Sequence, residues 1–125
     1  MLGLRTTIYK VGNITEAKKW YALAFKKAPY FDEPYYVGYN SGGFELGLQP
    51  AEESDQEKIP TVISYWGVED IEEAYQHLLS CGASSDNPPM NVGGPLMVAT
   101  VKDPWNNIVG IIYNPVFKIE GDSDQ

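Results

Sequence analysis

VGNITEA, at residues 11–17, returns 57 residues later as VEDIEEA at residues 68–74. Val, Ile, Glu and Ala occupy the same places in both copies, and the residue before Ile is Asn13 in one and Asp70 in the other. Either side chain can accept a hydrogen bond from the backbone N–H of the glutamate three residues later, which is the pattern that begins a helix. Each copy therefore predicts the end of a strand followed by the start of a helix.

The segments around the two copies follow the same order. Runs rich in β-branched and aromatic residues predict strands, and apolar residues at helical spacing predict one helix after each copy. The expected strands are residues 5–11, 35–39, 44–49, 61–68, 96–102 and 108–114. The expected helices are residues 14–27 and 70–81. Residues 84–95 contain Asn-Pro-Pro and Gly-Gly-Pro, so we expect them to form a loop.

The closing strands of the two halves also match, because FELGLQP at 44–50 aligns with VGIIYNP at 109–115, 65 residues on. Each half is thus predicted to contain, in order, one strand, one helix and three further strands. The predicted fold class is α+β, with tandem βαβββ modules forming a curved mixed sheet that has a concave cleft. We expect a single domain at 1–118 and a flexible acidic tail at 119–125. Within that domain the expected parts are module 1 at about 4–50, an acidic linker at 51–59 and module 2 at about 60–115.

Composition excludes several classes of function. The 125 residues carry 9 Lys+Arg against 17 Asp+Glu, a net charge of -8 that argues against binding nucleic acid or an anionic membrane. One His and one Cys exclude zinc sites built from several such ligands, and also an internal disulfide. With no long apolar run and no targeting segment in the sequence, we expect a cytoplasmic protein.

Three further motifs point to a known family. They are AKKWY at 17–21, similar to Ala-x-x-Phe-Tyr, LLSCGA at 78–83, similar to Leu-x-x-x-Gly-Ala, and DPWNN at 103–107, similar to Asp-Pro-Asp-Gly-Asn. With the βαβββ repeat, they make residues 4–115 resemble the vicinal oxygen chelate superfamily. That superfamily includes glyoxalase I, extradiol dioxygenases, fosfomycin-resistance thiol transferases and bleomycin-resistance proteins. The resemblance implies a homodimer, with the cleft built within one chain or by exchange of modules between two.

The resemblance also implies where a metal would bind. Family enzymes carry metal ligands on the first, fourth, fifth and eighth strands. The matching positions here are Thr6, Glu45, Ile63 and Gly110. A Lewis-acid site needs about three protein ligands and an open position. Glu45 is the one carboxylate among the four, so we predict no metal and no cofactor.

Strand alternation predicts which side chains line the cleft. The predicted lining residues are Thr6, Ile8, Glu45, Gly47, Gln49, Ile63, Tyr65, Gly110 and Ile112. The facing of Tyr35, Tyr39 and Trp66 stays open. A mostly apolar surface with one acid, one amide and one phenol suits an aromatic or amphipathic small molecule. Glu45 is then a carboxylate with a hydroxyl or water partner, an anchor for a cationic ligand, or a general base.

Three other residues invite a chemical interpretation. His77 lies off the apolar stripe of the second helix, so we expect a surface residue. We expect Cys81 to be a small packed residue, since no basic neighbour that would activate a thiol is evident. Trp105 is either an exposed lid residue or packed against a neighbouring loop.

The sequence therefore favours a glyoxalase/bleomycin-resistance-like protein that binds a small, cationic or aromatic molecule without a catalytic metal. The alternative is a glyoxalase- or dioxygenase-like enzyme, a lyase or oxygenase, with an atypical or absent metal site. Such an enzyme would need the metal-ligand set that is missing here, or a metal-free mechanism based on Glu45 and Tyr65. The sequence identifies no catalytic residue, and the expected partners are a small molecule and a second copy of the chain.

Overall fold

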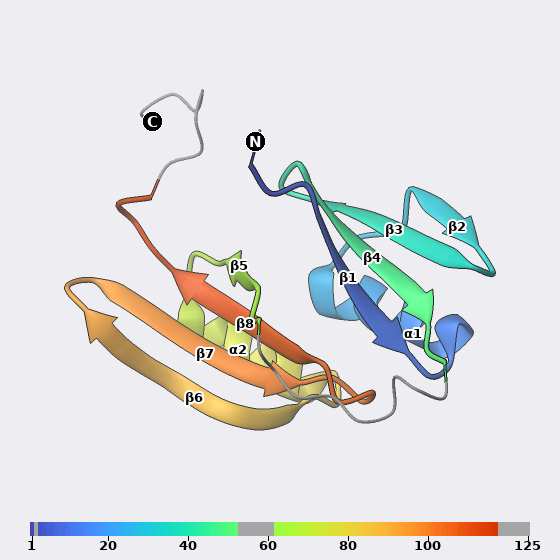
Figure 1. Cartoon of the computed structure of the whole chain (residues 1–125). Coiled ribbons are helices and arrows are strands. Elements are labelled where there is room, and N and C mark those ends of the chain that lie inside the picture. The colour runs from blue at the N-terminus through green and yellow to red at the C-terminus, as the bar shows by residue number, and fades with distance from the viewer. Residues whose placement is uncertain (2, 53–61, 118–125) are drawn as a thin grey trace.

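The computed structural model describes residue 1 and residues 3–52 and 62–117 (Figure 1). The chain has an α+β fold of two four-stranded mixed sheets, each with one helix. The first half contains β1 (Thr6–Val11), α1 (Ile14–Phe25), β2 (Phe31–Glu33), β3 (Tyr36–Ser41) and β4 (Phe44–Pro50). The second contains β5 (Tyr65–Gly67), α2 (Ile71–Ser80), β6 (Ser84–Gly93), β7 (Leu96–Lys102) and β8 (Ile108–Tyr113).

The two sheets have the same topology. Their strand orders are β1-β4-β3-β2 and β5-β8-β7-β6. In each sheet the first strand of the module pairs in parallel with the last, and the other pairs are antiparallel. This is the predicted βαβββ arrangement, formed twice. Most of the predicted linker, and the predicted tail, lie outside the described residues.

The repeated segment begins both helices as predicted. The side chain of Asn13 accepts a hydrogen bond from the Glu16 N–H at 3.1 Å, and that of Asp70 accepts one from the Glu73 N–H at 3.1 Å. α1 is shorter than predicted, because Lys26 adopts a left-handed conformation with φ of 56° and ends the helix at Phe25. Neither helix in the described part of the chain is long and apolar enough to cross a bilayer.

The prediction of a loop at 84–95 is wrong, since β6 occupies most of that segment. β6 is the edge strand of its sheet and pairs with β7 alone, with register shifts between Ser85 and Asn87, Asn87 and Met90, and Asn91 and Gly93. A proline, which has no N–H to donate, is tolerated at such edges and bulges. The strand expected at 35–39 instead runs from Tyr36 to Ser41.

The closing strands correspond with an offset of 63 residues, not the predicted 65. The ladders pair Ile8 with Gly47 and Tyr65 with Gly110, and Ile8 and Tyr65 occupy the same place in the repeat. The structural counterpart of Gly47 is therefore Gly110. The predicted and observed offsets differ by an even number of residues, so every side chain stays on its predicted face of the sheet.

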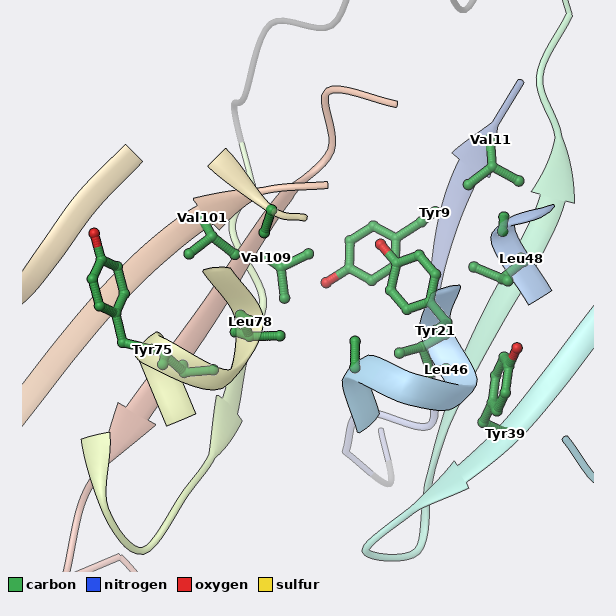
Figure 2. Close-up of a cluster of buried hydrophobic side chains, with 14 of the residues drawn as sticks. Tyr9, Val11, Tyr21, Tyr39, Leu46, Leu48, Tyr75, Leu78, Val101 and Val109 are labelled. Carbon is green, nitrogen blue, oxygen red and sulfur yellow. The ribbon is translucent and has the colours of Figure 1, made fainter. Parts of the chain in front are cut away.

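The core lies between the sheets and their helices (Figure 2). Its largest fully buried side chains are Tyr21, Tyr39, Leu46, Leu48, Val11, Val37, Val101 and Val109. Tyr21 of α1 stacks on Tyr9 of β1, with ring centroids 5.7 Å apart. In the second half, α2 buries Ile71, Tyr75 and Leu78, and Leu78 lies beside Val109 (Figure 2).

Hydrogen bonds join the two halves along their length. Thr7 Oγ1 lies 3.3 Å from Ser64 Oγ, and Trp66 Nε1 donates to the Tyr9 hydroxyl at 3.1 Å. Trp20 of α1 donates to the carbonyl oxygen of Cys81, which follows α2, at 2.8 Å. Both helices thus lie on one side of the molecule, and the helix-free faces of both sheets lie on the other (Figure 1).

Candidate functional site

The predicted cleft residues lie on the face of the sheets that carries no helix, which we call the helix-free face. Thr6 pairs with Glu45 and Ile8 with Gly47 in the first sheet, while Tyr65 pairs with Gly110 in the second. Their sequence neighbours, such as Tyr9, Leu46 and Ile111, are buried in the core, as alternation requires. Ile63 precedes β5 and is 39% exposed. Eight of the nine residues form two groups, five on the first sheet and three on the second, and Ile63 lies just before β5.

Tyr36 and Glu45 form the central polar contact of the first group. The Tyr36 hydroxyl donates a hydrogen bond to Glu45 Oε2. The Tyr36 ring reaches Glu45 across Gly47, where an added Cβ would lie 2.7 Å from Tyr36 Cζ. Only glycine leaves room for the ring at this point. Partial burial raises the pKa of Tyr36, so its hydroxyl remains a donor at neutral pH.

An aromatic cluster surrounds this pair, and sequence reasoning missed most of it. The ring of Phe31 lies 6.1 Å from that of Tyr36 and 6.3 Å from that of Tyr35. The Tyr30 ring lies over Gly38, where an added Cβ would come within 3.4 Å of Tyr30 Cε1. Tyr30, Phe31 and Tyr35 are all exposed. The run of aromatic residues at 30–36 is the signal that could have located this cluster.

The second group repeats the contact between a tyrosine and a glycine. Tyr65 lies against Gly110, where an added Cβ would come within 2.7 Å of Tyr65 Cδ1 and of the Ser64 carbonyl oxygen. Tyr65 is 43% exposed, and the neighbouring strand brings half-buried Ile112 to the same face. Each sheet therefore presents a tyrosine ring that lies over a glycine. Tyr39 and Trp66, whose facing the sequence left open, both point to the helix side.

The donors at the four family metal positions do not fit a metal site. With the corrected offset, the eighth-strand counterpart of Glu45 is Ile108, and not Gly110 as predicted. Ile63, Ile108 and Gly110 offer no side-chain ligand, Thr6 offers one neutral hydroxyl, and the Glu45 carboxylate already accepts a bond from Tyr36. Within residues 3–52 and 62–117, no three His, Cys, Asp or Glu side chains gather where they could hold an ion. A divalent Lewis acid needs about three protein ligands. We therefore derive no reaction step through a metal.

His77, Cys81 and Trp105 all lie where the two halves meet. His77 is half-buried, and its Nε2 lies 3.0 Å from the Leu23 carbonyl oxygen and 3.7 Å from Cys81 Sγ. The structure thus gives Cys81 a histidine neighbour that the sequence analysis did not foresee. Trp105 packs edge-on to Trp20, with centroids 6.4 Å apart, which settles its role as a packed residue.

With the two modules and the residues of their helix-free face located, comparison with known proteins identifies the family. The model of the Glyoxalase/Bleomycin resistance protein/Dioxygenase superfamily matches residues 3–111. The chain belongs to this superfamily. Among curated protein sequences, none matches this chain. The resemblance to the vicinal oxygen chelate superfamily is thereby confirmed.

Solved structures of this superfamily share the fold at low sequence identity. A glyoxalase-related enzyme from Fulvimarina pelagi matches with a TM-score of 0.76 and 20% identity, over 99% of this chain and 96% of that one. A superfamily member from Sphaerobacter thermophilus matches with a TM-score of 0.73 and 18% identity, over 91% and 98%. The fosfomycin resistance protein FosX from Listeria monocytogenes matches with a TM-score of 0.69 and 13% identity, over 93% and 94%. At these identities the likeness concerns the fold alone.

Proposed function

We propose that this superfamily member binds a small aromatic or cationic molecule on its helix-free face, without a catalytic metal. The observation that carries the proposal is the Glu45 carboxylate, held by Tyr36 beside the exposed rings of Phe31 and Tyr35. Aromatic faces attract organic cations, and a neighbouring carboxylate adds a charge of the opposite sign. The net charge of -8 raises the rate at which a cation reaches this face.

We further propose that two copies of the chain associate. β6 is an edge strand, and Met90 and Val92 on it are 53% and 51% exposed. Exposed apolar side chains at the edge of a sheet form a surface that a second copy of the chain can bury. Light scattering on the purified protein should give the mass of a homodimer, and the mass of a single chain would contradict this part of the proposal.

We also expect the protein to act in the cytoplasm, because its single cysteine offers no internal disulfide for an oxidising compartment. Fractionation of cells expressing the full chain would check this expectation. Recovery with the secreted or membrane fraction would contradict it.

The binding proposal is tested by a thermal-shift screen of aromatic, quaternary-ammonium and neutral compounds, followed by calorimetry on the hits. Glu45→Gln should lower the affinity for a cationic hit about threefold to tenfold, because the substitution removes the negative charge and keeps the shape of the side chain. Glu72→Gln is the matched control, since Glu72 is exposed on α2, on the opposite side of the sheets. Equal affinity in both variants would remove Glu45 from the site. Turnover of the bound compound would favour the enzyme alternative.

A further inference from the structure

A pocket lies on the opposite side of the sheets from the helix-free face. It has a volume of about 390 Å³ and lies between the two halves, reached from the side that carries the helices. Its apolar wall comes from Phe25 at the end of α1, Trp66 of β5, Leu78 of α2 and Val109 and Ile111 of β8. Its size falls within the range of small-molecule sites, which is roughly 300–1,000 Å³.

The aromatic part of the wall is held in place. Trp66 Nε1 donates to the Tyr9 hydroxyl at 3.1 Å, and burial raises the pKa of Tyr9 to about 12, so this acceptor stays neutral. Phe25 meets the Trp66 ring edge-on, with centroids 5.2 Å apart and the planes at 90°. Both residues are only half-buried, so the pocket is bounded by two fixed aromatic side chains that are accessible to a ligand.

The rim of the pocket is predominantly acidic. Glu69, Asp70 and Glu73 line one side, and Lys26 is the cation on the other. Asp70 is engaged, because it caps α2 by accepting from the Glu73 N–H. Across the described residues, the carboxylates of Glu69 and Glu73 form no ion pair or hydrogen bond, so both are available to a ligand.

We propose that this pocket is a second binding site, for a small organic cation with an aromatic or branched alkyl body. The apolar body would lie against Phe25 and Trp66, and Trp is the aromatic residue that attracts cations most strongly. The cationic head would lie toward Glu69 and Glu73. The site is separate from the one proposed on the helix-free face, because it is lined by the opposite side of the same sheets and by the helices.

The test uses benzyltrimethylammonium as the probe, with benzyl alcohol and phenylacetate as neutral and anionic counterparts. Binding is followed by calorimetry at low salt and by the shift of the Trp66 indole N–H resonance, which is assigned with Trp66→Phe. The cation should bind, and the neutral and anionic compounds should bind at least about tenfold more weakly, because the rim repels or fails to hold them. Ala74→Leu, which narrows the pocket from α2, should abolish binding while circular dichroism stays native.

Charge variants separate this site from the helix-free face. The double variant Glu69→Gln/Glu73→Gln should weaken the probe about fivefold to tenfold, whereas the control Glu72→Gln on the same helix should leave its affinity unchanged. The proposal is overturned if the probe does not bind at millimolar concentration or if benzyl alcohol binds equally well. It is also overturned if Glu45→Gln weakens the probe and the double variant does not. That last result would support the function proposed for the helix-free face.

Discussion

The hydrogen bond between Tyr21 and Asp103 offers the sharpest test of how the two modules are held together. Tyr21 lies on α1 in the first half and is fully buried, while Asp103 lies in the turn before β8 and is 2% exposed. The Tyr21 hydroxyl donates to Asp103 Oδ2 at 2.6 Å. Tyr21→Phe removes this one bond and keeps the ring that stacks on Tyr9.

The loss in the free energy of unfolding caused by Tyr21→Phe depends on the hydrogen-bond donors that Asp103 keeps. Asp103 Oδ2 keeps the Asn107 Nδ2 donor at 2.8 Å, and Oδ1 keeps the backbone N–H groups of Trp105 and Asn107. The carboxylate therefore stays partly satisfied, and the loss is that of one bond to a charged acceptor, about 2 kcal/mol. For a domain of this size, the midpoint of thermal unfolding should fall by about 8 °C.

Tyr39→Phe is the matched control. Its hydroxyl donates to a neutral acceptor, the Lys18 carbonyl oxygen, also at 2.6 Å, so its loss should cost about 1 kcal/mol. Urea titrations of both variants at pH 7 measure the two free energies of unfolding. Equal costs, or no cost for Tyr21→Phe, would refute the view that a buried carboxylate joins the modules.

Three further predictions concern single residues. Gly47→Ala should displace the Tyr36 ring and return the pKa of Tyr36 toward its usual value; an unchanged Tyr36 titration, followed by absorbance, would contradict the contact. Burial raises the pKa of Tyr9 from 10.0 to about 12, so the unfolded chain loses this proton first and stability should fall as the pH rises from 10 to 12. Tyr9→Phe should reduce this loss in the free energy of unfolding by about 3 kcal/mol. If urea titrations of the variant show the same pH dependence as the parent protein, the raised pKa of Tyr9 is not its cause. Asp70→Ala and Asn13→Ala should each cost about 1 kcal/mol, and unequal costs would show that the two repeated caps are not equivalent.

The sequence predicted the elements that depend on local signals. Asn13 and Asp70 begin their helices because a capping side chain and the N–H three residues later are fixed by adjacent chain. Strand alternation assigned the faces correctly, although the match of Gly47 with Gly110 needed the pairing of strands that lie far apart. Register between distant strands is not encoded by a short motif.

The sequence failed where tertiary context decides. β6 contains Pro88 and Pro89, which argue for a loop, and it forms a strand because it lies at a sheet edge with shifted register. The contact of Tyr36 with Glu45 depends on a ring that crosses a glycine on the next strand, which no spacing within one segment predicts.

Metal analysis tests the central claim most directly. The purified protein is assayed for bound metal and then titrated calorimetrically with Zn²⁺, Ni²⁺, Mn²⁺ and Fe²⁺. Thr6, Ile63 and Ile108 occupy three of the four family ligand positions in the observed register, so we predict no stoichiometric metal and no binding at micromolar concentration. One ion per site at micromolar or tighter affinity, lost in Glu45→Gln, would contradict the account.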